Sequence, residues 1–154
     1  MKRLPKYTPA EVRNDPYGFT YKEMSEVIGE NEAKALYEEL YKQLPRKKNL
    51  SMLVKNICKS SDTEKYVYEL KDNKYIETVF IKRRDGGTVC VSTQVGCPVG
   101  CIFCESGRNG FVRNLTSSEI VQQIILLRRK VNRIVFMGMG EPLSNYDNLI
   151  KSIH

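Results

Sequence analysis

Three of the five cysteines lie within the eight residues CPVGCIFC, from position 97 to position 104. Cys97, Cys101 and Cys104 have the spacing C-x3-C-x2-C, with Phe103 immediately before the last of them. Closely spaced thiolates bind soft metals, but a structural zinc site needs four ligands and a four-iron cluster needs one for each iron. Three thiols are an incomplete set, and the chain has only one histidine. Either the fourth ligand comes from elsewhere in the chain, or another molecule takes the open coordination position.

The other two cysteines do not decide whether the fourth ligand comes from the chain or from another molecule. Cys90 could supply a fourth thiolate and close a zinc or iron–sulfur site. Cys58 is expected to be a small, partly buried apolar residue. An odd number of cysteines gathered at one place argues against a disulfide framework and favours metal or redox chemistry.

The segment GMGEP, from 138 to 142, has residue types that suit a small ligand. Gly138 and Gly140 would let the backbone approach a ligand closely, because glycine has no side chain. Glu141 offers a carboxylate to an ammonium group. A chelating amino acid would fill the vacant position of a cluster held by three thiolates. A glycine turn followed by a surface glutamate would have the same sequence, so the segment gains weight only from its place after the cysteines.

The elements that would position these segments follow from the apolar patterning. KYVYEL (65–70) and KYIETVFI (74–81) predict a β-hairpin, and TVCVSTQV (88–95) predicts a third strand that leads directly to Cys97. A helix that is capped by Thr116 or Ser117 and ends in cations comes next.

The run RIVFMGMGEP, from 133 to 142, is typical of a buried parallel strand. Strand, helix and strand together indicate an α/β fold, in which ligand sites lie at the carboxyl ends of the strands. Both the cysteine loop and GMGEP fall at such ends. The last residues, from 146, predict the start of a helix with no stop signal, so we expect a fragment of a longer protein.

The N-terminal region has a different character. Residues 1–20 show no periodicity and are expected to form an extended arm. Apolar spacing predicts two short helices over 21–44, broken near Gly29, and another short helix over 50–59. The basic stretch PRKKN between them is expected to be a solvated loop or a phosphate contact.

Composition limits the function classes. The chain has 154 residues, of which 41% are hydrophobic, enough for one domain or a small domain plus part of another. The formal charge of +7 suits a polyanion such as nucleic acid, or is simply a generic basic surface. The chain has no apolar stretch of 18 residues and no secretory signal, so we expect a soluble cytoplasmic protein without membrane contact.

Three longer stretches resemble one known family. The stretches TVCVSTQVGCPVGCIFC, NGFVRNLTSSEIVQQI and VFMGMGEPLSNYDN resemble the RlmN/Cfr family of radical S-adenosylmethionine (SAM) RNA adenine methyltransferases. The resemblance runs from about residue 76 to residue 148, and Pro142 and the GF-x-RNL segment favour the adenine-C2, RlmN-type branch. It implies the first part of a partial (β/α) barrel, preceded by a small helical accessory domain and a β-hairpin. We expect the accessory domain over 1–60 and the hairpin and barrel over 61–154.

The resemblance also implies roles for single residues. Cys97, Cys101 and Cys104 match the ligands of a [4Fe-4S] cluster, and Gly140 and Glu141 match the segment that binds the amino group of SAM. Two further positions match catalytic residues: Glu77 matches the proton acceptor, and Cys90 matches the cysteine that forms a disulfide with a methyl-carrying cysteine.

The implied reaction is methylation of C2 of an adenosine in 23S rRNA, through a methyl-cysteine intermediate, with tRNA as a further substrate left open. An electron donor such as flavodoxin or ferredoxin is implied as well. The methyl-carrying cysteine of the family lies beyond His154, so we expect this chain alone not to methylate RNA. Two other functions stay open: a zinc- or cluster-containing RNA-binding module without catalysis, and a radical SAM enzyme with another substrate.

Overall fold

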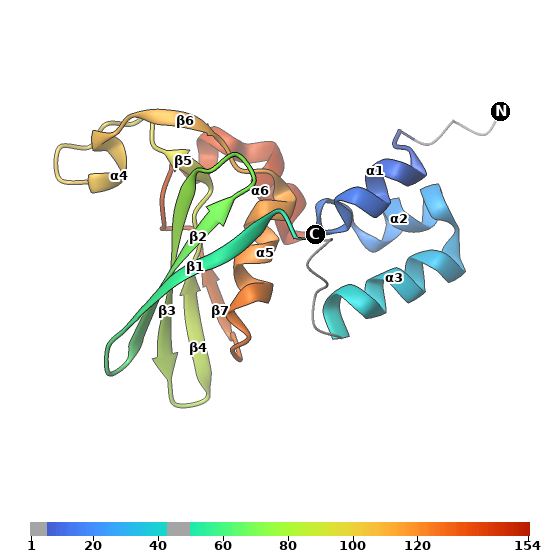
Figure 1. Cartoon of the computed structure of the whole chain (residues 1–154), viewed down its shortest axis with the longest axis horizontal. Helices are drawn as coiled ribbons and strands as arrows, with labels where there is room; N and C mark the ends of the chain where they lie inside the picture. The colour runs from blue at the N-terminus through green and yellow to red at the C-terminus, as the bar shows by residue number, and fades with distance from the viewer. Residues whose placement is uncertain (1–5, 43–49) are drawn as a thin grey trace.

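The computed structural model describes residues 6–42 and 50–154 and shows a helical N-terminal part beside a β-sheet (Figure 1). The extended arm expected over residues 1–20 is wrong for residues 9–18, which are helical; residues 1–5 lie outside the described ranges. Thr8 and Glu11 form a capping box that starts the first helix, a local signal that leaves no periodicity. The N-terminal elements are α1 (Pro9–Asn14), η1 (Pro16–Gly18), α2 (Tyr21–Ile28) and α3 (Glu30–Lys42).

The predicted break between two helices near Gly29 is confirmed. Gly29 follows α2 with a φ of 85°, a conformation that glycine adopts readily. The N-terminal helices enclose a small core, against which Val121 and Ile125 of a later helix also pack. The basic segment 45–49 lies outside the described residues. The core residues are Val12, Tyr17, Met24, Ala33 and Leu40.

Five strands form the main sheet, in the order β1-β2-β3-β4-β7. The first four are antiparallel neighbours, and β7 pairs in parallel with β4. The predicted hairpin is confirmed as β2 and β3. The strands are β1 (Met52–Lys59), β2 (Thr63–Leu70), β3 (Tyr75–Arg83), β4 (Gly86–Cys90) and β7 (Arg133–Val135).

The short helix expected over 50–59 is wrong, because residues 52–59 form strand β1. This strand lies at the sheet edge, and of its residues only Met52 is buried, so it lacks the alternation that marks a strand. A register shift between Val54 and Asn56 breaks the two-residue period further. The division of the chain at residue 60 stays a prediction.

The third predicted strand is present but interrupted. β4 ends at Cys90, and β5 (Gln94–Gly96) belongs to a separate two-stranded sheet with β6 (Phe111–Asn114). The cysteine loop and the short helix α4 (Glu105–Arg108) lie between β5 and β6. This small ribbon holds both ends of the cysteine loop.

Helix α5 (Ser117–Leu127) covers one face of the main sheet. Its cap is Thr116, one of the two predicted residues, and Glu119 completes the capping box. The predicted strand–helix–strand unit is confirmed as β4, α5 and β7. The core between helix and sheet includes Tyr66, Tyr68, Phe80, Val89 and Ile120.

The long buried strand predicted over 133–142 is wrong in length and in burial. β7 has three residues, and Ile134 is 44% exposed because β7 pairs only with β4 in the described sheet. The chain then forms η3 (Pro142–Asn145) and the predicted last helix, α6 (Tyr146–Ile153). No helix of the described residues is long and apolar enough to cross a membrane.

Candidate active site

Glu77 and Cys90 project from the face of the sheet that α5 does not cover. Val79 is paired with Cys90 across β3 and β4, and Glu77 lies two residues before Val79 on the same strand. Cross-strand partners and residues two apart share a face. Thr78 and Phe80, which alternate with Glu77 and Val79 along β3, point to the other face and are buried beneath α5. The sheet thus places the two sequence-predicted catalytic residues on one face.

Glu77 accepts an ion-pair contact from Lys65 of β2 at 2.9 Å. Its side chain is 45% exposed, so the carboxylate remains open to solvent or to a ligand. The carboxylate in turn raises the pKa of Lys65, because it hydrogen-bonds the charged ammonium group. Lys65 was not recognised from the sequence, and only the strand register reveals it.

Cys90 ends β4 with its thiol half-buried. Burial raises the pKa of this thiol, and a backbone contact with Met137 offsets the change in part. The protonated thiol is therefore favoured at neutral pH. All five cysteines are free, so the structure holds no disulfide at this position.

The cysteine loop leaves the ribbon at a crowded glycine. Gly96 has a φ of 73°, and a Cβ there would lie 1.9 Å from the carbonyl oxygen of Gly110. The backbone N–H of Cys97 donates to the same oxygen at 3.2 Å, and the N–H of Cys104 donates to the Cys101 carbonyl at 3.0 Å. These hydrogen bonds fix the base and one turn of the loop. Two apolar side chains of the loop are exposed to solvent. Ile102 is 94% exposed and Phe103 is 88% exposed.

The three loop cysteines are half-buried and free. Within residues 6–42 and 50–154, no group of three or more His, Cys, Asp or Glu side chains is arranged to hold a metal ion. The fit to an iron–sulfur cluster therefore rests on the donor set: three reduced thiols, at short spacing, in one exposed loop.

The GMGE segment is bound closely to residues 91–94. The backbone N–H of Gly138 donates to the Val91 carbonyl at 3.0 Å, and the N–H of Met139 donates to Ser92 Oγ at 2.8 Å. The N–H of Glu141 donates to Gln94 Oε1 at 2.8 Å. Parts of the chain about 47 residues apart are thus held side by side at the carboxyl ends of β4 and β7.

Both glycines of this segment have a packing role that the sequence did not reveal. A Cβ at Gly138 would lie 2.7 Å from the Val91 carbonyl oxygen. Gly140 has a φ of 99°, and a Cβ there would lie 2.5 Å from Gln94 Cβ. The glycines let the segment approach residues 91–94, and a role toward a ligand stays a prediction.

Glu141 caps the short helix that follows it. Its Oε1 accepts a hydrogen bond from the backbone N–H of Leu143 at 3.1 Å, and its side chain is half-buried. The carboxylate is thereby oriented by the chain. A fixed carboxylate of this kind is a suitable acceptor for an ammonium group.

Sequence reasoning missed Ser92 and Gln123, which join the parts of the site. Ser92 Oγ donates to the Glu77 carbonyl at 2.6 Å and accepts from Met139 N–H. Gln123 of α5 accepts from the Ser92 N–H at 2.8 Å and donates to the Ser92 carbonyl at 2.9 Å. Both side chains are fully buried. A signal was present, because Gln122 and Gln123 interrupt the apolar face of the predicted helix.

A pocket of about 390 Å³ lies where these segments meet. Glu77 lines it, together with residues on either side of the cysteine loop and with Met139 of the GMGE segment. Cys90, Gly140, Glu141 and the three loop cysteines are not among its lining residues. The residues that flank the cysteine loop here are Gly96, Glu105, Ser106, Asn109 and Gly110.

The chain is similar to known proteins over most of its length. The model of the radical SAM superfamily matches residues 91–153. A probable dual-specificity RNA methyltransferase RlmN from Thermotoga sp. (strain RQ2) is 52% identical over 108 residues, which are 68% of this chain and 32% of that protein. The protein of the same name from Thermosipho melanesiensis is 42% identical over 97% of this chain and 44% of its own length.

A solved structure shows the same fold. The crystal structure of a radical SAM methyltransferase from Sphaerobacter thermophilus matches with a TM-score of 0.81 and 31% identity, over 90% of this chain and 50% of that one. The chain thus spans less than half of the two curated relatives and half of this structural neighbour.

Proposed function

Because the chain belongs to the RlmN-type family of radical SAM proteins, we propose that it forms the cofactor-binding part of an RNA adenosine methyltransferase. Its fold is the first part of the radical SAM barrel, with the helical region and the hairpin ahead of it. The observation that supports the proposal most directly is the 390 Å³ pocket, which joins Glu77, the flanks of the cysteine loop and Met139.

The cysteine loop and the GMGE segment divide the binding of the cofactors. Cys97, Cys101 and Cys104 would hold three irons of a [4Fe-4S] cluster, and Gly140 and Glu141 would bind the amino group of SAM at the remaining iron. When bound, the two groups supply a carbon radical that removes a hydrogen atom. The carboxylate of Glu141 is already oriented by the Leu143 N–H, so the chain contributes a fixed acceptor for an ammonium group.

Glu77 and Cys90 would act on the substrate side. Glu77, which lines the pocket and forms an ion pair with Lys65, would accept a proton from the base. Cys90 would attack the sulfur of the methyl-carrying cysteine, which in the family lies beyond His154. A disulfide would form as the bond from that sulfur to the carbon already attached to the base breaks, with its electron pair leaving on the base and a proton then added there. Burial raises the pKa of the half-buried Cys90 thiol, so the protonated form is favoured at neutral pH.

The specific reaction that we propose is methylation of C2 of an adenosine in 23S rRNA through a methyl-cysteine intermediate, with tRNA as a second substrate. The charge of +7 supports an RNA substrate. An electron donor such as flavodoxin or ferredoxin would reduce the cluster. An RNA substrate and five free cysteines favour the cytoplasm.

The test is anaerobic reconstitution of the chain with iron and sulfide, followed by EPR of the reduced protein with and without SAM. We expect about four irons per chain, which corresponds to one [4Fe-4S] cluster, and an EPR signal that shifts when SAM is added. The Cys101→Ala variant should lose the cluster, and the matched Cys58→Ala variant should keep it, because Cys58 lies outside the loop.

Two outcomes would contradict the proposal in different ways. A colourless protein that takes up zinc and no iron would favour the RNA-binding module. A cluster that forms but gives the same EPR signal with SAM would contradict the assigned SAM site. The Cys90→Ala variant would then report whether Cys90 closes the cluster.

A further inference from the structure

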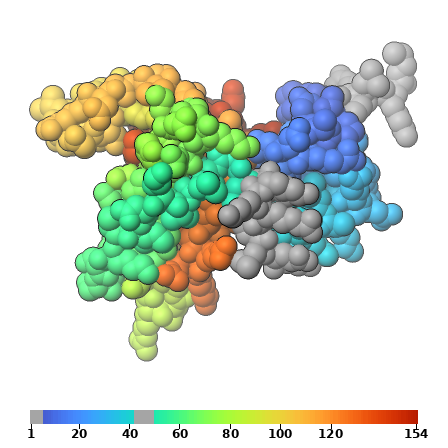
Figure 2. All heavy atoms as spheres, in the orientation of Figure 1, coloured from blue at the N-terminus to red at the C-terminus, as the bar shows by residue number. Residues whose placement is uncertain are grey.

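A strongly basic surface lies at the amino end of β4, at the opposite end of this strand from Cys90. Two runs of three consecutive cations contribute to it, 82–84 at the end of β3 and 128–130 after α5, and Arg133 begins β7. All seven side chains are exposed. Figures 1 and 2 show the turn between β3 and β4 at one extremity of the molecule and the segment around α4 at another. The basic end surface consists of Lys82, Arg83, Arg84, Arg128, Arg129, Lys130 and Arg133.

Backbone contacts bring the two runs together. The N–H of Asn132 donates to the Gly87 carbonyl at 2.9 Å, and its side-chain amide donates to the Asp85 carbonyl at 3.0 Å. Gly86 makes room for this contact, because a Cβ there would lie 2.3 Å from Asn132 Oδ1. The segment between α5 and β7 therefore lies directly against the turn between β3 and β4.

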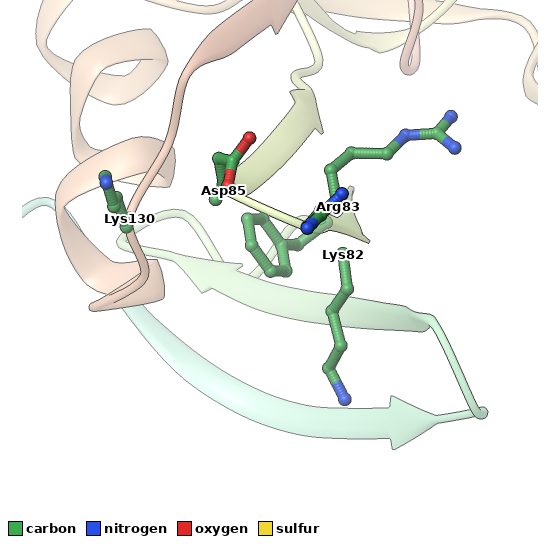
Figure 3. A pocket seen from close by; sticks show the side chains of 7 residues that line it. Lys82, Arg83, Asp85 and Lys130 are labelled. Atoms are coloured by element: carbon green, nitrogen blue, oxygen red, sulfur yellow. The ribbon is translucent and has the colours of Figure 1, made fainter.

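Few carboxylates neutralise this surface. Glu64 contacts both Arg129, at 3.0 Å, and Lys82, at 3.8 Å. Within the described part of the chain, the other five cations make no ion pair. Asp85 also lies in this region, between Lys130 and Arg83 in Figure 3. The positive charges of this end thus clearly outnumber the negative ones.

The surface contains two hollows, both open to solvent. A hollow of about 550 Å³ lies between the end of β3 and Lys130, as Figure 3 shows. A second hollow, of about 410 Å³, is lined by the same turn together with Asn132 and Arg133. Arg83, Arg84 and Asp85 line both, so the two hollows adjoin. Two adjoining basic hollows can accept successive anionic groups.

We propose that the basic end surface binds the phosphodiester backbone of RNA, at a place separate from the pocket where the base reacts. This inference rests on the proposed function, because it takes RNA as the substrate. Cations that have no carboxylate partner repel one another at close range. Successive phosphates of an RNA backbone would neutralise them, and the counterions condensed on the RNA would be released. Exposed arginines contact phosphates with two parallel N–H groups each.

The position of the basic end surface limits the distance that a bound RNA has to span between this surface and the pocket. From Gly86 to Gly96 the chain advances ten residues, which is at most about 35 Å when extended. An RNA that places an adenosine in the pocket therefore has to span no more than about this distance to reach the basic end surface.

The test measures binding of a fluorescein-labelled, unmodified tRNA transcript to the 154-residue chain by anisotropy at increasing salt, without iron or SAM. The variant Arg83→Ala/Arg84→Ala/Arg133→Ala should bind about tenfold more weakly, and its slope of log Kd against log salt should fall by about 2 to 3. The control Lys6→Ala/Lys22→Ala/Lys34→Ala removes the same charge from the N-terminal part and should stay within about twofold of the unmodified chain. The variant Arg83→Lys/Arg84→Lys/Arg133→Lys should keep most of the slope, which separates loss of charge from loss of folding.

Three results would overturn the inference. The first is unchanged binding in the triple alanine variant, and the second is an equal loss in the control, which would mean that only net charge matters. The third is stronger binding of polyglutamate than of RNA, which would assign the surface to an acidic protein. Because binding is measured without cofactors, a failure of the cluster or SAM experiments would leave these results intact, and the reverse also holds.

Discussion

Cys90 is the residue whose chemistry depends most on where the sheet places it. Its burial raises the pKa of the thiol, so the thiolate is scarce at neutral pH. We expect iodoacetamide to alkylate Cys90 more slowly than the exposed Cys58, with a pH midpoint above the value of about 8.5 for an ordinary thiol. Peptide mass spectrometry of samples labelled between about pH 7 and 10 would measure both cysteines in one experiment. Faster labelling of Cys90 at neutral pH would contradict the assignment of a protonated thiol.

At this scale the sequence predicts residue types better than it predicts partners. The spacing of Cys97, Cys101 and Cys104 is visible in the sequence because it is local. The resemblance alone indicated Glu77, since one glutamate in a strand has no distinctive pattern. Lys65 and Ser92 were missed, because their contacts depend on strand register and on the fold of distant segments.

Among the elements, α5 determines the position of the site through Gln123. The Gln123→Ala variant would leave the N–H and carbonyl of Ser92 and the hydroxyl of Thr78 without their partner. Buried polar groups that lose a partner cost about 1–3 kcal/mol each, so we expect a loss of about 3 kcal/mol in the free energy of unfolding. Urea unfolding measures this loss, and hydrogen exchange should show faster exchange at the Ser92, Gly138 and Met139 amides.

Gln122 provides the matched control on the same helix. It is equally buried, but its amide accepts a hydrogen bond from the Ser51 N–H and donates one to the Ser118 hydroxyl. Ser118 in turn donates to Asp15, next to the N-terminal helices. The Gln122→Ala variant should therefore increase exchange at Ser51 and leave the Met139 amide protected. If both variants loosened Met139 equally, Gln123 would have no special role in holding the site.

The elements were predicted well where their pattern is periodic. Alternation predicted β2 and β3, and the capping sequence at Thr116 predicted α5. β1 was missed because it is an exposed edge strand with a register shift, and α1 because it spans only six residues. The length of β7 was overestimated, since β7 ends at Val135 and the backbone of Gly138 and Met139 instead hydrogen-bonds to residues 91–94 beyond the end of β4.

For the whole molecule, the stability at acid pH should depend on Glu64. Its hydrogen bonds from Arg129 and Tyr66 lower the pKa of this buried carboxyl from 4.5 to about 2. The unfolded chain therefore binds the proton more readily, so the contribution is complete above about pH 4.5 and is lost as the pH falls toward 2. We expect Glu64→Gln to lower the free energy of unfolding by about 2 kcal/mol at pH 7.

Urea unfolding at pH 7 and at about pH 2.5 would measure this effect, and the difference between the variant and the unmodified chain should shrink at the lower pH. The Glu105→Gln variant is the control, because Glu105 is exposed and, among the described residues, forms an ion pair with Arg108 alone, three residues along the chain. A Glu64→Gln penalty that is the same at both pH values would show that the pKa of Glu64 is not lowered by folding.

The parallel pairing of β4 with β7 also has a consequence for how the chain folds. Neighbouring strands from β1 to β4 are connected by short turns, whereas Cys90 and Val135 meet across 45 residues. Closing so long a loop costs more entropy than closing a hairpin, so the antiparallel strands can assemble first and β7 joins them late. The GMGE segment follows directly after β7. The pocket is thus completed at the end of folding, and a local opening that releases β7 would dismantle it while the antiparallel strands stay folded.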